Sequence, residues 1–89
     1  MEIIMLKEEV RNTLVKFLID RLEIPFGDDS ELDDDTHLFD YGYIDSLDSL
    51  VLLTFLEQKF KVAVSPDDLV DNSLNTVNEI TDFVFSRLN

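Results

Sequence analysis

Apolar residues recur along the first quarter of the chain at the spacing of an α-helix. They lie three or four positions apart, at Leu6, Val10, Leu14, Phe17, Leu18 and Leu22. Because an α-helix completes a turn in about 3.6 residues, this spacing gathers them on one face. The pattern therefore predicts a first helix over residues 6–22.

The helical pattern stops in the next segment, between Glu23 and Ile44. Pro25, Gly27 and an acidic run over residues 28–35 mark it as a solvated connection. A loop this long within a compact domain is usually functional or locally ordered. We expect it to do more than join two helices.

A second helix is predicted from Asp45 to about Phe60. Asp45 is suited to be its N-cap, and Asp48 places a carboxylate in the first turn, where the helix dipole favours negative charge. One apolar stripe, suited to the core, contains Leu52, Leu53, Leu56 and Phe60. A second apolar face contains Leu47, Leu50 and Val51, which either dock a partner or cargo or pack against the long loop.

The rest of the chain predicts an extended connector and two more helices. Residues 61–64 alternate like a strand, but no second strand pattern exists to pair with them. Ser65 and Pro66 begin a short helix that ends near Val70, and a capping-box pattern at residues 76–79 opens a final helix. The expected fold is a single all-α domain over residues 1–89: a small four-helix bundle with three main helices, one short helix and a long loop between the first two main helices.

Size and charge narrow the functions that such a bundle can have. The 89 residues leave no room for a second domain. Twenty acidic residues against seven Lys and Arg give a formal charge of −13, which argues against nucleic acid as a partner. Nothing basic lies between Leu22 and Gln58, so the middle of the chain should attract basic protein surfaces.

Residue types also exclude several kinds of chemistry. The chain has no cysteine, and its single histidine, His37, has no evident nucleophile beside it, so no catalytic residue is expected. No metal site is expected either, because the acidic run lacks the central Gly and closing Glu of an EF-hand loop. No segment resembles a secretory signal or reaches transmembrane length, so we expect a cytoplasmic monomer.

The most informative stretch runs from Leu38 to Leu47 and ends in the triplet Asp45-Ser46-Leu47, after Gly42. With the preceding loop, the later Phe60 and the final capped helix, it resembles the acyl carrier protein family over nearly the whole chain. The resemblance implies that Ser46 receives a 4′-phosphopantetheine arm from coenzyme A through a phosphopantetheinyl transferase. It also implies acyl- or aminoacyl-activating enzymes and acyl-processing enzymes as partners, for a carrier that is not itself an enzyme.

The triplet occurs twice in tandem, because Asp48-Ser49-Leu50 follows directly. Members of the family carry a Gly a few residues before the modified serine and an aromatic residue fourteen positions after it. From Ser46 these are Gly42 and Phe60, whereas the position fourteen residues after Ser49 is Ala63. Ser49 would also sit inside the helix, where its hydroxyl can bond to the carbonyl of Asp45. Both arguments favour Ser46.

Two features depart from the carriers of general fatty-acid synthesis. The segment from Gly42 to Ser46 is one residue longer than usual, and Phe39 precedes it, as in D-alanyl and other stand-alone specialised carriers. Val51, Thr54 and Gln58 replace acidic residues on the exposed face of the second helix. We therefore expect a dedicated pathway, with a partner-binding surface made by Asp45, Leu47, Asp48, Leu50, Val51 and Thr54.

A noncovalent adaptor is the alternative function. Such a module would use the same acidic and apolar surface to bind a protein, without a prosthetic group. The exposed backbone N–H groups at the start of the second helix, and the positive end of its dipole, favour the carrier, because they suit a phosphate on Ser46.

Overall fold

The computed structural model describes residues 5–26, 32–71 and 74–88. These residues form four helices: α1 (Lys7–Asp20), α2 (Ser46–Phe60), α3 (Pro66–Asp71) and α4 (Val77–Arg87). No strand occurs in the described part of the chain. Lys61 ends α2 in a left-handed conformation with φ of 57°, and residues 61–65 connect α2 to α3 without regular secondary structure. The predicted all-α bundle, with three main helices and one short one, is confirmed.

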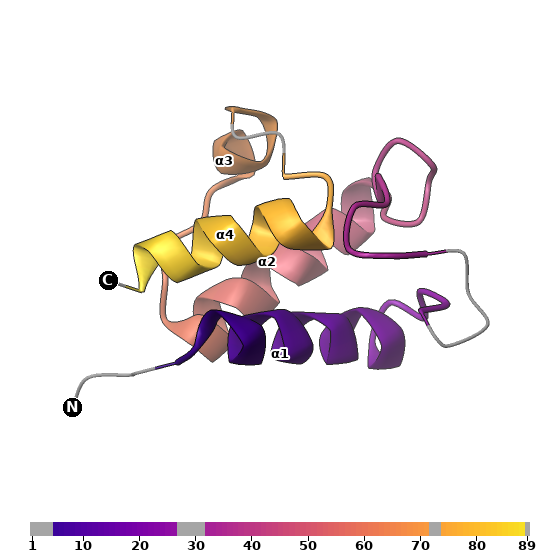
Figure 1. Cartoon of the computed structure of the whole chain (residues 1–89). Coiled ribbons are helices and arrows are strands. Elements are labelled where there is room, and N and C mark those ends of the chain that lie inside the picture. Colours follow the sequence, from indigo (N-terminus) through magenta and orange to yellow (C-terminus); the bar gives the residue numbers. More distant parts are fainter. Residues whose placement is uncertain (1–4, 27–31, 72–73, 89) are drawn as a thin grey trace.

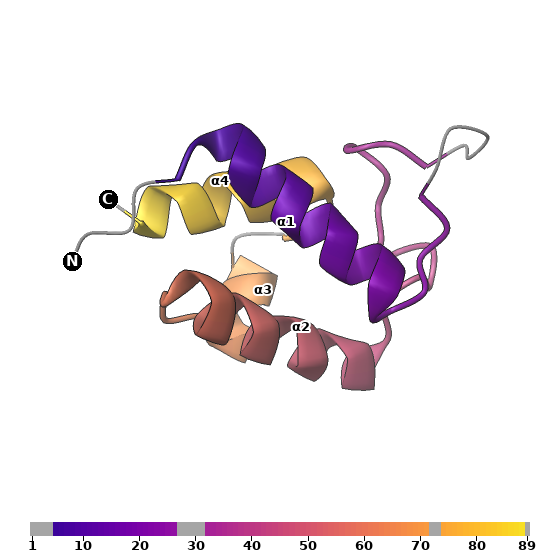
Figure 2. The ribbon, with the colours of Figure 1, turned by 90° about the horizontal axis from the view of Figure 1, so that it is seen from below.

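The helices enclose one core, into which each main helix turns its apolar face. Helices α1 and α4 pack against each other (Figure 1). Helix α2 lies along the other side of α1, and α3 lies between α2 and α4 (Figure 2). The Phe17 and Phe55 rings stack between α1 and α2, with centroids 3.9 Å apart. The predicted core stripe of α2 is buried, as Leu52, Leu53, Leu56 and Phe60.

Local capping sequences explain where the later helices begin. At the start of α4 the Thr76 hydroxyl accepts from the Glu79 N–H at 3.0 Å, and the Glu79 carboxylate accepts from the Thr76 N–H at 3.1 Å. This is the capping box that the sequence predicts. At the start of α3 the Ser65 N–H donates to the Asp68 carboxylate at 2.8 Å, and Pro66 is the first helical residue, also as predicted.

Helix α1 ends two residues earlier than its apolar pattern indicates. After Asp20 the chain turns, and Glu23 adopts a left-handed conformation with φ of 57°. The turn lets the Ile24 N–H donate to the Leu18 carbonyl at 3.0 Å and buries the Ile24 side chain. The helix stops because burial of Ile24 requires the chain to reverse.

The described part of the long loop is ordered by contacts with α1 and with the start of α4. The Leu38 N–H donates to the Asn75 carbonyl at 2.8 Å, and the Phe39 N–H donates to the Asn75 side-chain oxygen at 2.9 Å. Leu38 itself is fully buried. The backbone that leads to α2 is therefore fixed against the bundle.

Candidate functional site

Ser46 is the first residue of α2 and lies on the surface. Asp45 precedes it as the N-cap, and its Oδ1 accepts from the Asp48 N–H at 2.8 Å. The Ser46 hydroxyl forms no hydrogen bond with any described residue. It is therefore an exposed hydroxyl, free to react, at a well-defined helix start.

The loop before Ser46 is folded tightly around Leu38. The N–H groups of Tyr43 and Ile44 both donate to the Leu38 carbonyl, at 2.9 and 3.1 Å, and the Ile44 side chain is buried. Gly42 has φ of +80°, a conformation that side-chain-bearing residues rarely adopt. Buried residues on both sides of this turn thus set the position of Ser46.

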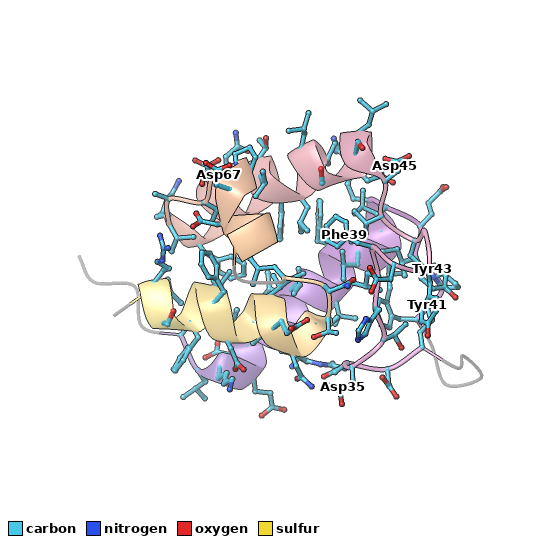
Figure 3. The ribbon with its side chains drawn as sticks, turned by 90° about the horizontal axis from the view of Figure 1, so that it is seen from above. Asp35, Phe39, Tyr41, Tyr43, Asp45 and Asp67 are labelled. Carbon is cyan, nitrogen blue, oxygen red and sulfur yellow. The ribbon has the colours of Figure 1, made fainter. Side chains whose placement is uncertain are left out.

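Two tyrosines lie beside the start of α2. Tyr41 is largely exposed and Tyr43 is partly buried. Figure 3 shows both at the same end of the molecule as Asp45, whereas Asp67 on α3 lies toward the other end. Phe39, by contrast, packs against the core. The tyrosines therefore border the surface from which an arm on Ser46 would extend.

Ser49, the competing serine, is held within the helix. Its hydroxyl donates to the Ser46 carbonyl at 2.6 Å, and its backbone N–H donates to the Asp45 carbonyl at 2.9 Å. The expected bond from the Ser49 hydroxyl to Asp45 is wrong by one residue, because the side chain reaches the carbonyl three positions back. Ser49 is also half-buried, so its hydroxyl is both bonded and less accessible than that of Ser46.

The side chains expected to bind partners lie on α2 and at its N-cap, and each is exposed or half-buried. Leu47 is 74% exposed and Leu50 is 55% exposed, so they do not pack against the described part of the loop. Asp45 and Thr54 are also exposed, whereas Asp48 and Val51 are half-buried. The Thr54 hydroxyl donates to the Leu50 carbonyl at 3.0 Å. These residues thus combine exposed leucines with two carboxylates, which lie at the end of α2 nearest Ser46.

Two hydrogen-bonded contacts to carboxylates lie in or against the loop, one from Arg11 and one from His37. Arg11 holds Asp34 through two hydrogen bonds of 2.9 and 2.7 Å, and this contact lowers the pKa of Asp34. His37 Nδ1 lies 2.9 Å from Asp40 Oδ2, and this hydrogen bond lowers the pKa of Asp40.

The sequence did not identify the α4 residues that anchor the loop. The Asn78 N–H donates to the Asp34 carbonyl at 3.0 Å, and the Asn78 side chain donates to the Asp35 carboxylate at 2.7 Å. Asn75 provides the two bonds to Leu38 and Phe39. Asparagines next to a capping box carry no local signal of contacts some forty residues away.

The described residues contain neither a cluster of metal-ligating side chains nor a membrane-spanning helix. Within ranges 5–26, 32–71 and 74–88, no three His, Asp or Glu side chains are grouped so that they could hold a metal ion. Part of the acidic run, residues 28–31, lies outside these ranges. None of the described helices is long and apolar enough to span a membrane.

Comparison with known families agrees with this geometry. The model of the family described as "Phosphopantetheine attachment site" matches residues 12–84, which covers most of the chain. The chain therefore belongs to this family of phosphopantetheine-binding carriers, and its resemblance to acyl carrier proteins is confirmed. The prosthetic group is 4′-phosphopantetheine, covalently attached. A comparison with curated protein sequences finds no significant match.

The described residues fit this group. Attachment needs a hydroxyl that a transferase can reach, with open space around it for a long arm. Ser46 provides such a hydroxyl on the surface, and its neighbour Leu47 points largely into solvent.

Proposed function

We propose that this protein is an acyl carrier protein that holds acyl or aminoacyl groups as thioesters of a phosphopantetheine arm on Ser46. The exposed, unbonded hydroxyl of Ser46 at the start of α2 carries this proposal. A tethered cargo is offered to successive enzymes at high effective concentration. The partner enzymes perform the chemistry, and the carrier supplies position.

The attachment step requires a separate phosphopantetheinyl transferase. The Ser46 oxygen forms a bond to the phosphorus that carries the pantetheine of coenzyme A. The bond from that phosphorus to the adenosine portion breaks, adenosine 3′,5′-bisphosphate leaves, and the hydroxyl proton passes to a base of the transferase. Ser49 is a poorer acceptor, because its hydroxyl already donates to the Ser46 carbonyl at 2.6 Å.

Partner enzymes would dock on the surface formed by Asp45, Leu47, Asp48, Leu50, Val51 and Thr54. Its exposed leucines suit an apolar patch on the partner, and its carboxylates near Ser46 suit basic residues around that patch. Such a surface favours partners from a dedicated pathway over those of general fatty-acid synthesis. The small number of acidic residues on α2 beyond Asp48 supports the same choice.

Mass spectrometry tests the proposal directly. The purified chain is incubated with coenzyme A and a promiscuous phosphopantetheinyl transferase. We expect a mass increase of one phosphopantetheine, which Ser46→Ala abolishes and Ser49→Ala leaves intact. Modification that persists in Ser46→Ala would refute the choice of serine. No modification of the wild-type chain would favour the noncovalent adaptor.

A further inference from the structure

A groove lined mainly by apolar residues lies between α1 and α2, with Arg21 at one wall. It encloses about 350 Å³ between Phe17 and Arg21 at the end of α1 and Leu50, Val51 and Thr54 on α2. The stacked rings of Phe17 and Phe55 close one side. Figure 2 shows the end of α1 and the start of α2 close together on its right side.

Arg21 is the charged residue of this lining. The other two arginines are paired, Arg11 with Asp34 and Arg87 with Asp68. Among the described residues, no ion pair includes Arg21 and no carboxylate lines the groove. In a chain with a formal charge of −13, a cation beside an apolar cavity without a carboxylate suits an anionic ligand.

The distance between the groove and Ser46 would let a group carried on an arm at Ser46 reach the groove. Leu50 is one helical turn beyond Ser46, and Gln58 marks the far end of the lining, so the α2 wall spans roughly 6 to 18 Å along the helix axis from Ser46. An arm on Ser46 that folds back along α2 brings its cargo into this range. The volume of 350 Å³ is at the small end of ligand cavities and suits one short chain.

We propose that this groove holds the cargo of the carrier's own arm, and that the cargo is an acyl chain whose far end carries a carboxylate. The inference rests on the proposed attachment at Ser46. The methylene groups would lie against Leu50, Val51 and the phenylalanine rings, and the terminal carboxylate would accept hydrogen bonds from the Arg21 guanidinium. A partner protein's acidic side chain is the competing occupant.

The test compares two cargoes of equal length. Octanoyl and octanedioyl groups are loaded from their coenzyme A thioesters by a promiscuous transferase, and intact mass confirms loading. They differ by replacement of the terminal methyl group with a carboxylate. Failure to load would count against attachment at Ser46, whereas the present inference is judged on the loaded proteins alone.

Nuclear magnetic resonance and thioester reactivity report occupation of the groove. We expect octanedioyl, more than octanoyl, to shift the Arg21 Nε–H and the Leu50 and Val51 methyl resonances. We also expect its thioester to react with hydroxylamine about two- to fivefold more slowly, the effect of one partly exposed ion pair. High salt should reduce the difference.

Variants separate a binding role for Arg21 from a general charge effect. Arg21→Gln should remove the difference between the cargoes, and Arg21→Lys should retain part of it. Lys59→Gln is the matched control, since it removes an exposed positive charge from α2 outside the groove lining and should leave the difference intact. Equal resonance shifts and equal hydroxylamine rates for the two cargoes in the wild type would overturn the inference. So would a difference in these quantities that survives Arg21→Gln. Shifts that appear only when a partner enzyme is added would assign the groove to the partner instead.

Discussion

The pair between Arg11 and Asp34 gives the sharpest test of how the long loop is held. Its two hydrogen bonds join α1 to a loop segment that also bonds α4 through Asn78. The side chains are 39% and 29% exposed, so water screens part of the attraction. A charge-assisted pair can contribute about 1.5–3 kcal/mol when buried, and exposed pairs contribute less than about 1 kcal/mol. We therefore expect Asp34→Asn to lower the free energy of unfolding by about 1 kcal/mol at pH 7.

The effect should depend on pH with a definite sign. The hydrogen bonds from Arg11 lower the pKa of Asp34 below 3.8, its ordinary value in an unfolded chain. Its stabilising contribution is therefore fully present above that value, and is lost as the pH falls through the lowered pKa of the folded state. The free energies of unfolding of the wild type and Asp34→Asn should differ at pH 7 and become equal in strong acid.

Thermal and urea unfolding across this pH range measure the difference. For a domain of this size, about 1 kcal/mol corresponds to a shift in Tm of roughly 4–8 °C. A double-mutant cycle with Arg11→Met isolates the coupling. Asp20→Asn, which breaks the well-exposed pair with Lys16, is the matched control and should leave Tm almost unchanged. A difference that stays constant from pH 7 to strong acid would show that the Asp34 charge is not its cause.

Three other substitutions test the site and the core, each by urea unfolding. Asp45→Ala should cost about 1 kcal/mol through loss of the α2 cap, and Asp45→Ser should restore most of it; equal losses in both would refute the capping role. Gly42→Ala should cost about 1 kcal/mol from its φ of +80° alone, because no atom lies within 4 Å of an added Cβ. Thr81→Val should leave stability unchanged or raise it by up to about 1 kcal/mol, because the buried Thr81 hydroxyl has no partner among the described residues, and a clear loss would reveal one.

The helices could be predicted because their signals are local. The apolar spacing of α2 fixes which residues face the core, and the sequences at Asp45, Ser65 and Thr76 each contain both partners of a cap within three or four positions. The end of α1 could not be placed in this way. It depends on Glu23 reversing the chain so that Ile24 is buried, and burial is decided by the rest of the fold.

The parts of the site that the sequence did not reveal all depend on contacts between distant segments. The loop is fixed by Asn75 and Asn78, which lie some forty residues after the atoms they bond. The groove beside Arg21 exists only because the end of α1 packs near the start of α2. Residue type and spacing predict Ser46 as the attachment site and Asp45 as its cap, but they could not show that Arg21 lies outside the ion pairs of the described residues.

The cap of α2 also changes the expectation for the phosphate on Ser46. A helix start can bind a phosphate because its first N–H groups are free and its dipole is positive there. In α2 the Asp45 carboxylate already accepts from the Asp48 N–H, so a negative charge occupies this end of the helix. A phosphodiester on the adjacent Ser46 would meet this like charge within screening distance. The Asp45 carboxylate therefore disfavours binding of the phosphate to the helix start, so the ester bond alone would hold the phosphate of an arm attached at Ser46.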